Sequence, residues 1–364
     1  MLNIFAAIVM FGLIILIHEF GHFILAKLNG IYVVEFSIGM GPRLISFIKG
    51  ETRYSLKALP FGGSCLMLNE FDSADDAGIL PEGVSREELA GRGFTDKSVW
   101  ARISVVIAGP VANFLLALAC ACFVVSQAGY MPPVVQDVEQ GSPAYEAGLQ
   151  KGDVITKIAG KKVSDYRDIF LYQTVNPGKT YVLEWERGEG ESLQIYSRQV
   201  TPVYSEESGS YLMGCMFPGY VPTKNIGETL KYAAYEVKYQ ISASVQSLGM
   251  LFRGKIKAGD ISGPVKIVSV VSETVGQARQ YGIETVILNL LNLSIMLSAN
   301  LGVMNLLPVP ALDGGRLFFL IIEALRGKPI DPEKEGRVHA AGMAVLMVLM
   351  IFILFQDIKS LMFT

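Results

Sequence analysis

The chain has 364 residues, of which 51% are hydrophobic and 18% are charged, and its formal net charge is −3. An average soluble domain is about 25% charged. The missing charge is concentrated in a few long apolar blocks, which excludes a disordered chain and argues against a purely soluble one. The slightly acidic balance predicts no nucleic-acid partner. The four cysteines form no CxxC pair, so we expect neither a disulfide scaffold nor a thiolate zinc site.

Four segments are long and apolar enough to cross a lipid bilayer, which requires about 20 residues. We do not expect the first segment to be a signal peptide, because no positively charged stretch precedes it and no small-residue cleavage site follows it. The sequence therefore predicts a membrane α-helical bundle of four transmembrane helices. The four segments run from about residue 4 to 28, 103 to 125, 283 to 307 and 340 to 355.

Lysine and arginine residues gather in the two loops that follow the first and third spans. The positive-inside rule places these loops in the cytoplasm and predicts that both termini face outward. The region of about 130–280 is then extracytoplasmic, and the first and third spans cross the membrane in the same direction.

The first inner loop contains short β-like stretches between Tyr32 and Met67, separated by glycines. Lipid does not tolerate exposed non-helical backbone, so we expect a membrane-associated β region tucked against the bundle. After Leu68 the loop becomes acidic and polar and is expected to lie in the cytosol.

The outer region begins with a small α+β domain at 130–202, where strand-like and helix-like stretches are separated by glycine-containing turns. An extracytoplasmic linker at 203–281 follows. It includes an amphipathic helix from Asn225 to Phe252, because apolar residues recur there at helical spacing. We therefore divide the chain into 1–129 (first two spans), 130–202, 203–281 and 282–364 (last two spans).

The motif HEFGH lies in the first span and places His18, Glu19 and His22 on one helix. Residues four apart on a helix point to the same side, so both imidazoles can bind one metal ion. Glu19 can reach a water on that ion and act as general base. Two histidines and one further carboxylate with an open position form a catalytic zinc site. Ionisable groups inside a membrane are costly, and they usually mark function.

The third ligand must be a carboxylate near a span, and depth decides among the candidates Glu35, Asp313, Glu323 and Asp357. At 1.5 Å per residue, His18 lies about 21 Å beyond residue 4, near the inner leaflet. The third span ends at the same depth, and Asp313 follows it directly in NLLPVPALDGG. The prolines break the helix and the glycines allow a tight turn, so Asp313 is the predicted ligand. Asp357 falls at the outer face and is excluded.

Two asparagines and the remaining histidine allow more than one interpretation. Asn305 can hydrogen-bond a substrate carbonyl or the reacting oxyanion, or it can form an interhelical contact. Asn113 can orient a substrate strand or bridge helices. His339, at the start of the fourth span, is expected to be an interface residue and not a ligand.

Four motifs together resemble the site-2 protease family of intramembrane zinc metalloproteases. They are HEFGH in the first span, AGPVANF in the second, ISGPVKI before the third and NLLPVPALDGG at its end. The stretch GSPAYEAGLQKGDVITKIAGKKV resembles a PDZ domain, which is typical of the bacterial branch that cleaves anti-sigma factors.

The resemblance implies a role for each matching residue. His18, His22 and Asp313 match the zinc ligands, Glu19 matches the general base, and Asn305 matches an asparagine near the scissile bond. The 32–67 stretch resembles the β region that receives the substrate as an extra strand. We therefore assign substrate binding to Gly62 and Gly63 of PFGGSCLML, and to Asn113 and Asn305.

The predicted function is zinc-dependent hydrolysis of peptide bonds within transmembrane segments of membrane proteins, such as anti-sigma factors or signal-peptide remnants, in a bacterial cell membrane. The expected partners are the lipid bilayer, a transmembrane substrate and a substrate C-terminus at the PDZ-like domain, which can instead exclude bulky substrates. The alternative is a non-proteolytic PDZ-bearing membrane receptor or scaffold with a structural zinc site.

Overall fold

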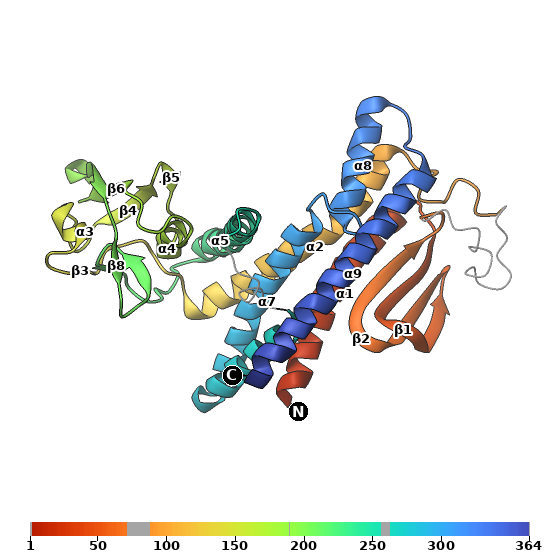
Figure 1. Ribbon diagram of the computed structural model, residues 1–364, viewed down its shortest axis with the longest axis horizontal. Coiled ribbons are helices and arrows are strands. Elements are labelled where there is room, and N and C mark those ends of the chain that lie inside the picture. The colour runs from red at the N-terminus through yellow and green to blue at the C-terminus, as the bar shows by residue number, and fades with distance from the viewer. Residues whose placement is uncertain (1, 71–87, 189, 256–262, 364) are drawn as a thin grey trace. The chain divides into compact units, whose positions relative to one another are not determined.

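Four helices are long and apolar enough to cross a membrane, within the residues that the computed structural model describes: 2–70, 88–188, 190–255 and 263–363. They confirm the four predicted spans. The last one is longer than predicted, because its first turns carry charged residues that an apolar pattern does not mark. The helices are α1 (Leu2–Leu28), α2 (Val99–Ala128), α7 (Ile283–Asn305) and α9 (Pro332–Phe363) (Figure 1).

The chain divides into a first unit, formed by residues 1–117 and 256–364, and a second unit, formed by residues 118–255. In the first unit, α1 packs against α7 and against α6 (Pro264–Ala278). Val286 at the start of α7 shares an apolar cluster with Ala7 of α1, and Asn305 at the end of α7 reaches His18, so the two helices run in the same direction, as expected.

Helix α6 differs from the expectation that residues 203–281 form an extracytoplasmic linker with one amphipathic helix. Val271 and Val275 of α6 are buried against Ala7 and Met10 of α1. The described part of the ISGPVKI motif, from Gly263 on, therefore begins a helix of the bundle; its first two residues lie outside the described residues. Its apolar residues recur at helical spacing over only four turns, too few to be recognised as a span.

Strands β1 (Val33–Lys49) and β2 (Thr52–Met67) form a strongly bent antiparallel pair. Ile38 of β1 pairs with Gly63 on one side and with Leu56 on the other, so the two strands fold into a sheet of four short segments. The order across this sheet is 62–67, 33–40, 52–59 and 43–49. The predicted β region is confirmed.

The outer part of this sheet exposes apolar side chains. Its exposed large residues are Ile38, Met40, Leu44, Ile45, Phe47, Ile48, Leu56 and Leu59. So many exposed apolar residues in one small sheet are unusual on a soluble protein. This is the surface expected of a sheet at the edge of a membrane.

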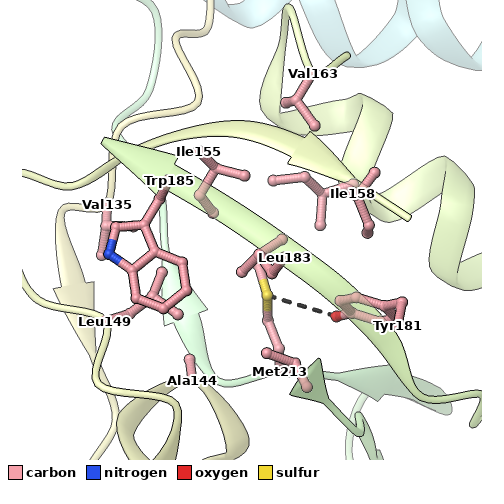
Figure 2. Close-up of a cluster of buried hydrophobic side chains, with 12 residues drawn as sticks. Val135, Ala144, Leu149, Ile155, Ile158, Val163, Tyr181, Leu183, Trp185 and Met213 are labelled. Atoms are coloured by element: carbon pink, nitrogen blue, oxygen red, sulfur yellow. Dashed lines mark hydrogen bonds between the residues drawn. The ribbon is translucent and has the colours of Figure 1, made fainter. Parts of the chain in front are cut away.

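The second unit has an antiparallel sheet with the strand order β5-β4-β6-β7. Its core packs Leu183 and Trp185 of β6 against Met213, as Figure 2 shows. Its elements are β3 (Asp137–Val138), α3 (Pro143–Glu146), β4 (Val154–Ile158), β5 (Lys161–Lys162), α4 (Tyr166–Val175), β6 (Tyr181–Arg187), η2 (Gly190–Ser192), β7 (Gln194–Val200), β8 (Val203–Ser205), β9 (Ser210–Leu212), β10 (Cys215–Met216) and α5 (Ile226–Phe252).

Local sequence signals set the helix starts in this unit. The Ser142 side chain caps α3, and Asp165 and Asp168 form a capping box at the start of α4. Asn225 caps α5, which spans the predicted amphipathic helix. β10 pairs with β3, so residues after 202 belong to the same folded domain.

Candidate metal centre

His18 and His22 lie one turn apart on α1, with ring centroids 4.8 Å apart. Their Nε2 atoms are 3.2 Å apart, and both side chains are buried. The i, i+4 spacing therefore places two imidazole nitrogens at one point inside the first unit.

Asp313 reaches the same point from the first residue of α8 (Asp313–Arg326). Its Oδ2 lies 3.1 Å from His18 Nε2 and 3.4 Å from His22 Nε2. The chain folds back so tightly here that a Cβ on Gly314 would lie 2.2 Å from the Leu307 carbonyl oxygen. The glycines after Asp313 therefore allow the turn that aims the carboxylate at the two histidines.

A hydrogen bond fixes the protonation of His22. Its Nδ1 lies 2.8 Å from the Val105 carbonyl oxygen, which can only accept. Nδ1 therefore carries a proton, and in the neutral ring Nε2 presents a lone pair to Asp313. Such backbone contacts commonly orient metal-binding histidines.

Asn113 lies behind His18, with its amide 3.2 Å from His18 Nδ1. The Asn113 Oδ1 atom is buried without a hydrogen-bond partner. Turning the amide over would let Oδ1 accept a proton from Nδ1, since the two amide orientations have the same shape. The Asn113 side chain is fully buried, and its own carbonyl accepts from the Ser298 hydroxyl. Asn113 therefore connects α2 to His18 of α1 and to Ser298 of α7, which favours the helix-bridging interpretation over a substrate contact.

The cluster fits a metal ion. Asp313 Oδ2 is buried without a hydrogen-bond partner, and it faces imidazole nitrogens that present lone pairs. Three such atoms repel one another unless a proton or a metal ion lies between them. Ligands of a tetrahedral zinc ion are about 3.3 Å apart, given bond lengths of about 2.0–2.1 Å. The three distances, 3.1, 3.2 and 3.4 Å, match this edge length.

Gly109 of α2 closes one side of the cluster. A Cβ at this position would lie 2.3 Å from His22 Nε2 and 2.8 Å from His18 Cε1. Only glycine therefore lets α2 approach the two rings. The sequence reasoning singled out neither Gly109 nor Val105, although Gly109 lies in the AGPVANF motif.

Glu19 and Gly63 are in contact. A Cβ on Gly63 would lie 3.0 Å from Glu19 Cγ and 3.5 Å from Ile15 Cγ2. The 62–67 segment of the sheet therefore lies against α1 beside the metal cluster. Gly62 adopts a φ of +86°, which favours glycine at this bend.

Asn305, the last residue of α7, also reaches the cluster. Its amide nitrogen lies 3.4 Å from His18 Nε2, and the side chain is only partly buried. Of the two predicted asparagines, Asn305 is partly exposed and Asn113 is fully buried.

The other carboxylates near the spans have different partners. Burial would raise the pKa of Glu35, but hydrogen bonds from Arg43 and Ser55 lower it to about 2. Glu323 forms an ion pair with Arg102. Asp357 accepts hydrogen bonds from three backbone N–H groups at the start of α6. Asp313 is therefore the one candidate carboxylate found at the histidines.

The second unit contains a separate groove of about 490 Å³. Tyr166, Phe170 and Gln173 of α4 form one wall, and residues 212–217, which include β10, form the other. A strand and a helix that flank a groove can hold an extended peptide.

Comparisons with known proteins identify the family of this chain. The model of peptidase family M50 matches residues 6–349. A Clostridium acetobutylicum protein that bears a zinc metalloprotease name is 39% identical to this chain, over 98% of it and 97% of the relative. The regulator of sigma-W protease RasP of Bacillus subtilis is 31% identical, over 99% of both chains. Among solved structures, the PDZ domain of an SdrC-like protein from Listeria monocytogenes covers 24% of this chain and 86% of that domain, with 19% identity and a TM-score of 0.20.

Proposed function

This chain belongs to peptidase family M50, and from that premise we propose how its residues divide the work of a zinc-dependent intramembrane protease. The enzyme is a zinc metalloprotease of the site-2 type. The observation that carries the residue assignment is the convergence of His18, His22 and Asp313 beside Glu19, on a helix that can span a membrane.

His18, His22 and Asp313 hold the zinc ion in this proposal. A zinc ion held there would supply Lewis-acid chemistry, since it would polarise the scissile carbonyl and lower the pKa of the attacking water. Glu19 takes a proton from the attacking water and passes it to the leaving amine, so the carboxylate is regenerated after each cycle. Asn305 donates its amide N–H to the carbonyl oxygen as negative charge develops there.

The 62–67 segment presents the substrate. A transmembrane helix hides its carbonyls in hydrogen bonds and does not unwind in lipid without replacement partners. The segment 62–67 is an edge of the sheet among the described residues, and Gly63 touches Glu19. An unwound substrate can add there as a further strand, which brings its backbone to the zinc site. Gly63 has no side chain, so the segment packs directly against Glu19 and its backbone lies beside the metal cluster.

The substrates are transmembrane segments of bacterial membrane proteins. The name of the Bacillus subtilis relative, regulator of sigma-W protease, supports an anti-sigma factor as one substrate of this chain. The lysine and arginine pattern supports an orientation in which the metal site is near the cytoplasmic leaflet and the second unit is extracytoplasmic.

The groove between α4 and β10 receives an extended peptide in this proposal. Its mixed lining, with the Tyr166 and Phe170 rings beside the Gln173 amide, suits the C-terminal residues of a trimmed substrate. The receptor alternative is not favoured, because the metal cluster offers three ligands among the described residues and so leaves a position open.

The test uses the purified full-length protein in detergent with a fluorescent transmembrane peptide. We expect cleavage that a zinc chelator stops and that added zinc restores. Cleavage that continues with all metal removed would contradict the proposal.

A further inference from the structure

We infer that His339 of α9 is a positioning residue for Asp313: its imidazole holds the loop that aims this carboxylate at the metal. The inference rests on the proposed role of Asp313 as a ligand. The loop joins α7 to α8 and runs from residue 306 to 312.

A hydrogen bond joins His339 to this loop. The backbone N–H of Ala311 donates to His339 Nδ1 over 3.0 Å. Ala311 has a φ of +76°, a conformation that non-glycine residues rarely adopt and that surrounding contacts must maintain. Asp313 follows two residues later, so the strained residue and the ligand belong to one turn.

The contacts of His339 extend to both sides of Asp313. Its ring lies 5.6 Å from the Phe319 ring of α8, the helix that Asp313 begins. One turn along α9, a Cβ on Gly342 would lie 2.4 Å from Pro310 Cβ. The α9 face formed by His339 and Gly342 therefore contacts the loop before Asp313 and the helix after it.

The hydrogen bond also defines the chemical form of His339. Since Nδ1 accepts, the ring is neutral and its proton lies on Nε2. Nε2 is buried without a hydrogen-bond partner, and the Glu335 carboxylate is 3.8 Å away. A histidine that served only to fill an interface would not require a lone pair at this one nitrogen.

Two substitutions of similar shape to each other separate a positioning role of His339 from a role in filling the interface. In His339→Asn, the side-chain oxygen can occupy the position of Nδ1 and accept the Ala311 N–H. His339→Leu has a similar shape without an acceptor. We expect His339→Leu to raise the zinc dissociation constant by about 10- to 100-fold, the usual effect of losing a partner that orients a metal ligand, and His339→Asn to stay within about threefold of wild type.

The measurement is equilibrium dialysis of the detergent-solubilised full-length protein against zinc buffers, together with the absorption spectrum of the cobalt-substituted protein. The cobalt spectrum reports the ligand geometry, so it should change in His339→Leu and not in His339→Asn. Equal zinc affinities and equal spectra in the two variants would overturn the inference.

A second pair of variants tests the same loop without changing His339. Gly342→Ala adds a methyl group against Pro310 and should weaken zinc binding in the same way. Gly336→Ala lies on the same helix with open space around it and should not. The two proposals can fail separately. If the wild-type protein cleaves no peptide, the proposed reaction is contradicted. Weaker zinc binding in His339→Leu than in wild type would still support the positioning role.

Discussion

Both units have apolar cores, but the first unit also brings three metal-ligating side chains together. The core of the second unit is largely apolar, and its Tyr181 hydroxyl contacts the Met213 sulfur at 3.6 Å (Figure 2). In the first unit, His18, His22 and Asp313 place acceptor atoms against one another. Hydrophobic burial stabilises both units, and the first unit needs in addition a cation at its metal-ligating cluster.

The outer surfaces differ as well. In the most apolar window of α9 none of the residues is buried, although its mean hydropathy is 2.6. Exposed apolar surface of that extent requires lipid. The difference teaches that the first unit depends on two components outside the chain, lipid and metal, and that the second unit should be stable without metal. Four predictions follow this contrast, ordered by their expected effect on cleavage.

Glu19→Gln should abolish cleavage while zinc remains bound. The amide keeps the shape of Glu19 but cannot carry the proton from water to the leaving amine, a loss of at least about 10²- to 10⁴-fold. The measurements are peptide turnover and metal content of the same preparation. Normal turnover by this variant would remove Glu19 from the proposed mechanism.

Asp313→Asn should lower both zinc content and cleavage. The amide oxygen is a weaker ligand than a carboxylate and leaves the positive charge of the metal less compensated. Metal analysis after dialysis should show partial occupancy, and activity should recover in part at high zinc. Full occupancy after dialysis would show that another residue completes the site.

Gly109→Ala should weaken zinc binding although it removes no polar group. The added methyl would meet His22 Nε2 at 2.3 Å, so α2 must shift or the ring must rotate. We expect about a 10- to 100-fold loss of zinc affinity. Gly12→Ala on α1, where nothing lies within 4 Å, is the matched control. Equal affinities in the two variants would mean that the His22 side of the site is free to adjust.

The sequence predicted the parts of this site that follow from regular geometry. Helical spacing placed His18 beside His22, and the common direction of two spans placed Asp313 at their depth. The structure confirms that α1 and α7 run in parallel. The exclusion of Asp357 is also explained, because its carboxylate accepts the backbone N–H groups at the start of α6.

What the sequence could not predict depends on contacts between distant segments. Gly109 looks like any helix glycine until α2 is packed against His22. Helix α6 is too short to be recognised as a span, and the pairing of β10 with β3 involves strands of two residues each. A hydrophobic pattern does not identify elements this small, since their burial comes from the partner and not from their own sequence.

Leu183→Ala should have the smallest effect on cleavage and still destabilise the second unit. Leu183 is fully buried in the core, so its truncation should lower the free energy of unfolding of this unit by about 2–5 kcal/mol. Val182 is the neighbour on β6 and is 38% exposed, which makes Val182→Ala the matched control. Limited proteolysis of the full-length variants should cut the second unit faster in Leu183→Ala only. Zinc content and cleavage of a short transmembrane peptide should match wild type in both. A loss of zinc in Leu183→Ala would show that the metal site depends on the apolar core of the second unit, contrary to the separation argued here.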